Sequence, residues 1–155
     1  MRMWKTLRNP VLLFSLAIVS VANWLHAADT APQAVLVTVR SILADSRSNE
    51  FDPKLKDLEQ QLKPLKHRSY RSLKDQTQTI PWQGTGAFEI PGGRSLTIAT
   101  QEFQNNRIGL KIRLTQGEKP LIDTTVKIAN KGNIILGGPA HEGGSLVLSI
   151  SAVAQ

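Results

Sequence analysis

The second half of the chain alternates apolar and polar residues with a period of two, and this alternation constrains the fold more than any other feature. Residues 107–115 place Ile108, Leu110, Ile112 and Leu114 on one side and Gly109, Lys111 and Arg113 on the other. A strand with one apolar face belongs in an antiparallel sheet that covers a core on one side only. The sequence therefore predicts a mainly β, α+β domain, built as an antiparallel β-sandwich or an open barrel of about seven strands.

The other expected strands are separated by Gly, Pro and Asn turns. We expect strands at 35–44, 70–74, 87–90, 94–103, 121–129 and 146–153, with a short buried run at 134–136. The strand at 70–74 has the weak alternation of an edge strand, and 137–144 is expected to be a loop. Asn105-Asn106 lies between two alternating segments and predicts a hairpin, because Asn tolerates positive φ. Asp123 alternates with Ile122 and Thr124, so it is expected to face water.

One amphipathic helix is expected after the first strand, near residues 52–65. Asp52 is a good N-cap and Pro53 suits the first helical position. A leucine stripe follows at three- and four-residue steps, and Pro64 should end the regular helix. Such a short helix is marginal alone, so the stripe should pack against the sheet. The stripe consists of Leu55, Leu58, Leu62 and Leu65.

The N-terminus has the layout of a secretory signal peptide over residues 1–27. Arg2, Lys5 and Arg8 precede an apolar run from 11 to 25, and the small pair Ala27-Ala28 follows. We expect a Sec-type signal, a flexible lead over 28–33 and one β-rich domain over 34–155. This implies a bacterial protein that is periplasmic or secreted; an uncleaved membrane anchor is the less favoured alternative.

Composition excludes several classes of site. The chain has no cysteine, which excludes disulfides, thiolate metal sites and a lipid-modified cysteine. Its 19 Lys and Arg exceed its 12 Asp and Glu, but three of the basic residues belong to the predicted signal peptide. The remaining excess is small and dispersed, so no nucleic-acid partner is expected.

The densest basic segment is Lys63–Lys74. Its residues Lys66, Arg68, Arg71 and Lys74 are candidate binding residues for an anionic surface, a polymer or a membrane surface. The alternative is a solvated helix end, where the helix dipole favours cations without any ligand. Trp82 is either an anchor for a partner or a plug at one end of the sandwich.

A glycine-rich segment, 137–144, holds the candidate pair His141 and Glu142. The pair could serve a small hydrolase or a metal-dependent enzyme, but the motifs that such sites require are missing. There is no His four residues away, no phosphate-binding loop and no Gly-x-Ser-x-Gly elbow. The sequence therefore predicts no catalytic residue, no metal and no cofactor, and the glycines are favoured as turn formers.

Two resemblances to bacterial envelope proteins can be stated, and one of them implies a location. The segment TVKIANKGNIILGG, residues 125–138, resembles a β-hairpin phrase of outer-membrane secretins, although the chain is too short for a secretin barrel. The overall layout resembles small exported bacterial proteins, and this resemblance implies a periplasmic setting without implying an activity. The motifs that carry it are Asp52-Pro53-Lys54-Leu55, Ser69-Tyr70-Arg71-Ser72-Leu73 and Leu136-Gly137-Gly138-Pro139.

The expectation that follows is an exported, non-catalytic β-rich domain that binds or helps assemble another envelope component, with a protein as the partner. Strand addition at an exposed sheet edge is one mode of such binding. Two alternatives remain: a periplasmic hydrolase around His141 and Glu142, and an anionic binder acting through Lys63–Lys74.

Overall fold

The structure is a computed structural model, and it describes residues 30–155. The predicted signal peptide lies outside the described residues. Eight strands follow one another along the chain. They are β1 (Ala34–Asp45), β2 (Ser69–Pro81), β3 (Thr85–Ile90), β4 (Arg94–Gln104), β5 (Arg107–Gln116), β6 (Lys119–Ala129), β7 (Asn133–His141) and β8 (Gly144–Ala154).

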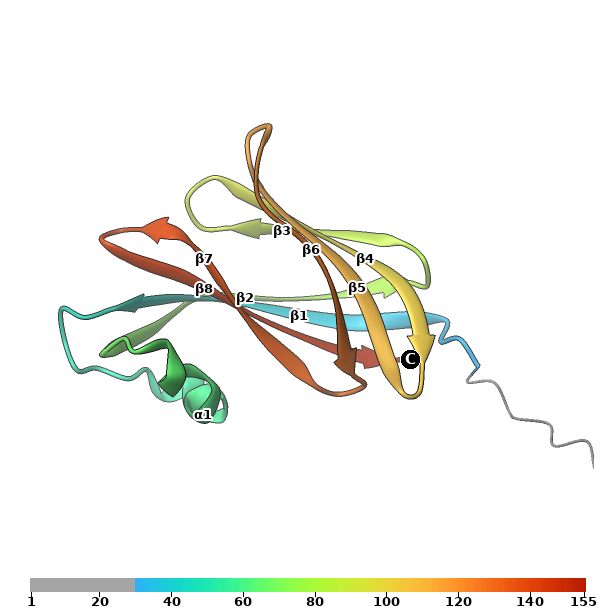
Figure 1. The fold of residues 1–155 in the computed structure, drawn as a ribbon, viewed down its shortest axis with the longest axis horizontal. Coiled ribbons are helices and arrows are strands. Elements are labelled where there is room, and N and C mark those ends of the chain that lie inside the picture. The colour runs from blue at the N-terminus through green and yellow to red at the C-terminus, as the bar shows by residue number, and fades with distance from the viewer. Residues whose placement is uncertain (1–29) are drawn as a thin grey trace, which may run out of the picture.

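The strands form two four-stranded antiparallel sheets that face each other (Figure 1). The first sheet has the order β2-β1-β8-β7, and the second has the order β3-β4-β5-β6. Each strand pairs with its neighbour in the chain except at two places, β2 to β3 and β6 to β7, where the chain crosses between sheets. The predicted antiparallel sandwich, mainly β with a helical segment after the first strand, is confirmed.

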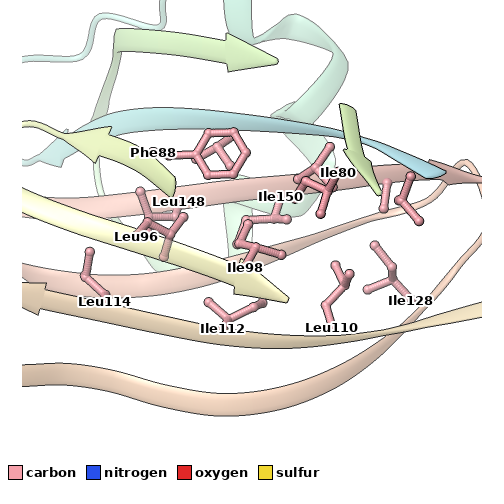
Figure 2. Packing of buried hydrophobic residues seen from close by; sticks show 14 of the residues in the cluster. Ile80, Phe88, Leu96, Ile98, Leu110, Ile112, Leu114, Ile128, Leu148 and Ile150 are labelled. Atoms are coloured by element: carbon pink, nitrogen blue, oxygen red, sulfur yellow. The ribbon is translucent and has the colours of Figure 1, made fainter. Parts of the chain in front are cut away.

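The main core fills the space between the two sheets (Figure 2). The alternating strands supply it, since every second residue of β5 points inward and is fully buried. Each such side chain stabilises the fold by about 1.5–3 kcal/mol relative to exposure. The largest fully buried side chains of this core are Ile80, Phe88, Leu96, Ile98, Ile108, Leu110, Ile112 and Leu114.

A second, smaller core lies on the outer face of the first sheet, beneath residues 53–65. We call this segment the helical strap. Its leucines Leu55, Leu58 and Leu62 are buried against Ile42 and Val147, which confirms the expected burial of the stripe. Leu65 is only partly buried.

The strap is less regular than the predicted helix. A 3-10 helix covers Pro53–Leu58, α1 covers only Glu59–Leu62, and a 3-10 turn covers Lys63–Leu65. Pro64 has no N–H with which to continue an α-helical ladder. At the other end Leu55 donates its N–H to the Asp52 carbonyl, which is the three-residue spacing of a 3-10 helix.

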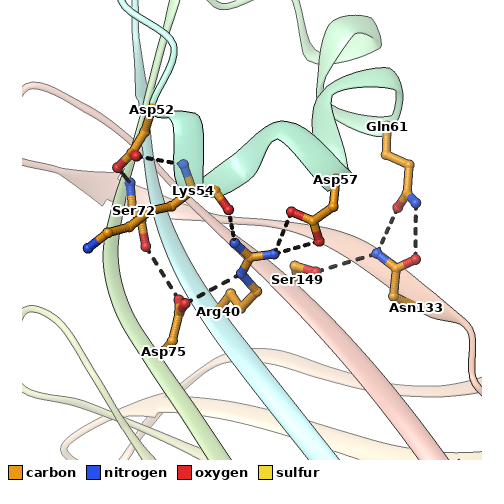
Figure 3. A network of polar contacts seen from close by, with 9 residues as sticks. All are labelled: Arg40, Asp52, Lys54, Asp57, Gln61, Ser72, Asp75, Asn133 and Ser149. Carbon is orange, nitrogen blue, oxygen red and sulfur yellow. Dashed lines mark hydrogen bonds and ion pairs between the residues drawn. The ribbon is translucent and has the colours of Figure 1, made fainter.

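Polar contacts fasten the strap to the sheet (Figure 3). Arg40 of β1 projects from the outer face, forms an ion pair with Asp57 at 2.8 Å and approaches Asp75 at 3.6 Å. It also donates to the Lys54 carbonyl. The predicted N-cap is confirmed, since the Asp52 carboxylate accepts from Lys54 N at 3.0 Å.

Two turn predictions had different outcomes. The Asn105-Asn106 hairpin is confirmed, with φ values of 52° and 56° between β4 and β5. The loop expected at 137–144 is wrong, because β7 continues through the glycines to His141 and only residues 142–143 form the turn. The pairing with β8 supplies the hydrogen bonds there, and a register shift between Gly137 and Ala140 absorbs the irregularity.

The edge strand expected at 70–74 is also longer than predicted. It extends from Ser69 to Pro81 and pairs with the whole of β1, with one bulge between Ser41 and Ile42. Residues 76–79, which alternate Gln and Thr, are therefore part of the sheet. Their polarity alone does not predict a strand.

The two ends of the described chain meet at one end of the sandwich. Gln33 donates its N–H to the Gln155 carbonyl at 3.1 Å, and Trp82 donates its N–H to the Gln33 carbonyl at 2.9 Å. The last residue of the predicted flexible lead is thus hydrogen-bonded. Because Ala34 pairs with Pro81 at one end of β1 and Asp45 pairs with Ser69 at the other, the strap's connections lie at the opposite end.

Candidate functional site

At two places an edge strand of one sheet lies beside an edge strand of the other, where the chain crosses between the sheets, and the contacts at these two seams differ. We call them the β2–β3 seam and the β6–β7 seam. All other strand edges in the described chain are paired within a sheet. Any unpaired backbone edge that a partner strand could use therefore belongs to β2, β3, β6 or β7.

Side chains bridge the β2–β3 seam. Gln76 donates its Nε2 to the Glu89 carbonyl at 2.6 Å, and Gln78 donates its Nε2 to the Ala87 carbonyl at 2.5 Å. Lys74 adds an ion pair to the Glu89 carboxylate at 3.3 Å. Carbonyls at the edge of β3 are thereby occupied by groups from β2, so this seam has fewer acceptors to offer.

The β6–β7 seam is joined only at the turn between its strands. There Gly132 donates its N–H to the Ala129 carbonyl at 2.8 Å, and two further bonds tie the turn to β8, from Lys131 N to the Ala152 carbonyl and from Ala154 N to Asn130 Oδ1. Along the rest of β6 and β7, within residues 30–155, no hydrogen bond or ion pair connects the two strands. Figure 1 shows the strands together at the turn and apart at their other ends.

Half-buried apolar side chains line the β6–β7 seam. They pack on the main core from one side and remain partly exposed on the other, unlike the inward residues of β4 and β5. Leu121, Ile122 and Val126 come from β6, and Ile134 and Leu136 come from β7. Thr124 of β6 lies between two of them and is also half-buried.

The local sequence explains the shape of β6. Ile122, Thr124 and Val126 alternate with Asp123 and residues that face water. Asp123 is exposed as predicted, and hydrogen bonding from the Arg113 guanidinium at 2.7 Å lowers the pKa of its carboxyl. The outer face of β6 is therefore polar, with Asp123 bound to Arg113 of β5. The inner face carries the shorter side chains of Ile122, Thr124 and Val126 at the seam.

The edges of β6 and β7 carry backbone donors and acceptors beside partly buried apolar side chains. That combination suits strand addition, in which main-chain hydrogen bonds give affinity and alternate side chains enter a groove. The residues of this seam belong, on sequence alone, to the predicted core, and no periodicity distinguishes them from fully buried positions. The sequence also gives no indication that the Gln76 and Gln78 side chains bridge two sheets. Their alternation with threonine indicates only that they share one face of a strand.

The four predicted basic residues have different environments in the structure. Lys74 takes part in the β2–β3 seam. Arg68 donates to Asn49 Oδ1 at 3.0 Å, and Lys66 ends the strap in a left-handed conformation with φ 59°. Arg71 lines a pocket at the strap's end of the sandwich. The anionic-surface alternative stays a prediction.

Trp82 lies in the turn between β2 and β3 and is partly buried against the main core. This contact fits the interpretation of Trp82 as an end plug. Whether the exposed part of the ring also meets a partner remains a prediction.

His141 faces an arginine rather than a metal-binding set. Its Nδ1 lies 3.3 Å from Arg94 Nη1, and Arg94 also donates to the Ala140 carbonyl at 3.0 Å. Because arginine only donates, Nδ1 must accept, so the neutral ring carries its proton on Nε2. That nitrogen is 4.0 Å from Glu142 Oε1. Arg94 thus joins the second sheet to the end of β7, and the hydrolase alternative remains a prediction.

The described residues contain neither a metal-binding cluster nor a membrane-spanning helix. Within residues 30–155 no three His, Asp or Glu side chains gather closely enough to hold a metal ion. The helices in this same range are too short and too polar to cross a bilayer. Comparisons of the chain with protein families, curated proteins and solved structures found no match.

Proposed function

We propose that the chain is an exported, non-catalytic binding domain of the bacterial cell envelope, and that its partner is another protein. The proposed contact is an extended segment of the partner that adds to the edge of β6 or β7. The predicted signal peptide and the resemblance to exported proteins support the location.

One observation carries the proposal: the β2–β3 seam is bridged by side-chain amides, whereas the β6–β7 seam is left unbridged. Proteins usually cover or charge an exposed edge because it invites pairing. At this seam the inward side chains are apolar, as at Ile122 and Leu136, and the charged side chains of β6 lie on its exposed outer face. An edge left in this state favours a partner strand with apolar residues at alternate positions.

A matched pair of variants tests the proposal. Thr124→Lys places a charge inside the seam, and Thr125→Lys places the same charge on the exposed outer face one residue away. We expect affinity capture from an envelope fraction, with the wild type as bait, to recover a partner protein. Thr124→Lys should lose this partner and Thr125→Lys should retain it, while both variants keep the wild-type melting temperature within a few degrees.

Photo-crosslinking from the native host provides the second measurement. A benzophenone side chain at position 122 should crosslink to the partner, and one at position 79, on the exposed side of β2, should not. Recovery of the mature protein alone at physiological salt would contradict the proposal. Equal capture by the two lysine variants would move the contact away from this seam.

A further inference from the structure

A pocket of about 830 Å³ lies at the end of the sandwich opposite the described chain termini. It is formed where β1 ends, where the strap is entered, where β2 begins and where β7 turns into β8. Pockets of this volume are typical of small-ligand or side-chain binding sites. The pocket does not include the β6–β7 seam.

The pocket is acidic in a basic protein. Four carboxylates line it, together with two guanidiniums, whereas the whole chain has a formal net charge of +7. The carboxylates belong to Asp45, Glu50, Asp52 and Glu142, and the guanidiniums to Arg47 and Arg71. The net charge of the pocket lining is therefore opposite in sign to the net charge of the chain.

Two of these carboxylates are already used within the chain. Asp45 accepts from Arg47 at 2.8 Å, and Asp52 accepts from Lys54 N and from Ser72 N at 3.1 Å. Hydrogen bonds from Arg47 lower the pKa of Asp45, and backbone hydrogen bonds lower that of Asp52, so both stay ionised at neutral pH.

The other two carboxylates are not used in this way. Within residues 30–155, the Glu50 side chain has no hydrogen bond or ion pair, and the nearest charged partner of Glu142 is His141 at 4.0 Å. Two acidic side chains at the pocket are therefore available to a ligand.

A mostly buried serine whose side chain makes no hydrogen bond within residues 30–155 also lines the pocket. Ser69 is only 8% exposed, and within the described residues its hydroxyl makes no hydrogen bond. The oxygen itself is not among the fully buried atoms that lack a partner, so solvent reaches it from the pocket. A ligand in the pocket could therefore replace water as the hydrogen-bond partner of Ser69. This observation is independent of the charges.

Aromatic rings provide the apolar part of the lining. Phe51 and Tyr70 meet edge to face with centroids 5.9 Å apart. The Tyr70 hydroxyl is directed elsewhere, since it donates to the Leu62 carbonyl at 2.9 Å. Tyr70 therefore has its ring, and not its hydroxyl, to offer a ligand, and aromatic rings attract cations.

We propose that this pocket binds an organic cation, an ammonium or guanidinium group carried on an alkyl chain. The Glu50 and Glu142 carboxylates would neutralise the cation, the rings of Phe51 and Tyr70 would contact the alkyl chain, and Ser69 would hydrogen-bond to the ligand. Arg71 makes no hydrogen bond or ion pair within the described residues, although its charge acts on Asp45, and it would meet an acceptor oxygen of the same ligand, such as a peptide carbonyl. The cation belongs either to a Lys or Arg side chain of a protein or to a free amine.

The chain itself supplies a reporter, because Tyr70 is its only tyrosine. Labelling the full chain with 3-fluorotyrosine gives one fluorine NMR signal at the pocket. The probes are N-acetyl-lysine N-methylamide, its neutral isostere N-acetyl-norleucine N-methylamide, and n-butylamine. We expect a saturable shift with the lysine probe and binding about tenfold weaker or less with the neutral isostere, since the charge contact is lost.

Paired variants locate the binding. Glu50→Gln/Glu142→Gln should weaken the lysine probe about tenfold. Glu102→Gln/Glu118→Gln removes two exposed carboxylates outside the pocket lining and should leave the affinity unchanged. Ser69→Ala should weaken binding by about threefold, in line with the loss of one neutral hydrogen bond. Circular dichroism confirms that each variant is folded.

The two cationic probes separate the sources of the ligand. Tighter binding of the lysine probe than of n-butylamine assigns the pocket to a protein side chain, and equal binding assigns it to a free amine. Equal shifts by the neutral isostere, an absence of saturation, or an unchanged affinity in the Glu50/Glu142 variant would overturn the proposal. A failure of the β6–β7 proposal would leave these outcomes unaffected, because the two regions share no residue.

Discussion

The two seams of the sandwich stand in the same topological relation to the sheets, yet only one of them is bridged. At the β2–β3 seam, Gln76 and Gln78 reach from one sheet edge to backbone carbonyls of the other. At the β6–β7 seam, the corresponding inward residues are Ile122, Thr124 and Val126, and within residues 30–155 no hydrogen bond or ion pair joins β6 to β7 beyond the turn.

Side-chain length and chemistry explain the difference. Packed sheets lie roughly 10 Å apart, so a polar contact between their edges needs a long side chain with a donor at its tip. Glutamine meets that requirement, whereas threonine, isoleucine and valine do not. A strand edge therefore stays without a side-chain bridge when the side chains that face the neighbouring sheet are short, even where they are apolar enough for a core.

The largest test compares the same substitution at the two seams. Ile80→Ala, at the bridged seam, should lower the free energy of unfolding by about 2–5 kcal/mol, because Ile80 is 1% exposed and leaves a cavity. Ile122→Ala, at the unbridged seam, should cost only about 1 kcal/mol, because half-buried atoms leave no closed void. Urea denaturation measures both, and equal losses would mean that the two seams are packed alike.

Removing the bridging amides should weaken the first seam itself. Gln76→Ala/Gln78→Ala deletes two hydrogen bonds and should cost about 1–3 kcal/mol in total. The control Gln101→Ala/Gln104→Ala deletes two exposed glutamines of β4 and should stay within about 0.5 kcal/mol of the wild type. A double variant as stable as its control would show that the seam does not depend on these bonds.

Thiol labelling measures how open each seam is in solution. The chain has no cysteine, so a single introduced one reports its own position. Ile122→Cys should react with a thiol reagent at least about tenfold faster than Ile80→Cys, because the buried position must first open locally. Similar rates would indicate that β6 and β7 close together in solution.

Acid should weaken the cap of the strap. Asp52 caps the strap and has a lowered pKa, so its contribution to stability is present above the ordinary Asp range and is lost as the pH falls through its pKa in the folded protein. Asp52→Asn should therefore melt below the wild type at neutral pH, and the difference should shrink below about pH 4. Calorimetry over this range checks the sign, and a difference that grows in acid would contradict it.

The fold class followed from the sequence because alternation reports which residues face a core. The Asn105-Asn106 hairpin, the exposed Asp123 and the buried leucines of the strap were all local patterns, and the structure confirms them. The loop at 137–144 failed for a related reason. Glycine and proline carry no alternation, so the pairing that extends β7 to His141 leaves no trace in the sequence.

The candidate sites were beyond the reach of local patterns. Ile122 and Ile112 look the same in sequence, and only the arrangement of the sheets makes one half-exposed and the other fully buried. The acidic pocket collects Glu50, Ser69 and Glu142 from three distant segments. Its formation depends on β8 pairing with β1, a long-range register that no short motif specifies.

The hydrogen bond between Gln33 and Gln155 has a practical consequence for anyone who immobilises the molecule. A tag, dye or surface linker attached at Gln33 or at Gln155 would leave from one pole, and the acidic pocket would be displayed at the other. The twelve residues of β1 separate these poles by roughly 36 Å. Biosensor chips and tethered-particle assays can therefore present the pocket to solution without a redesigned attachment point.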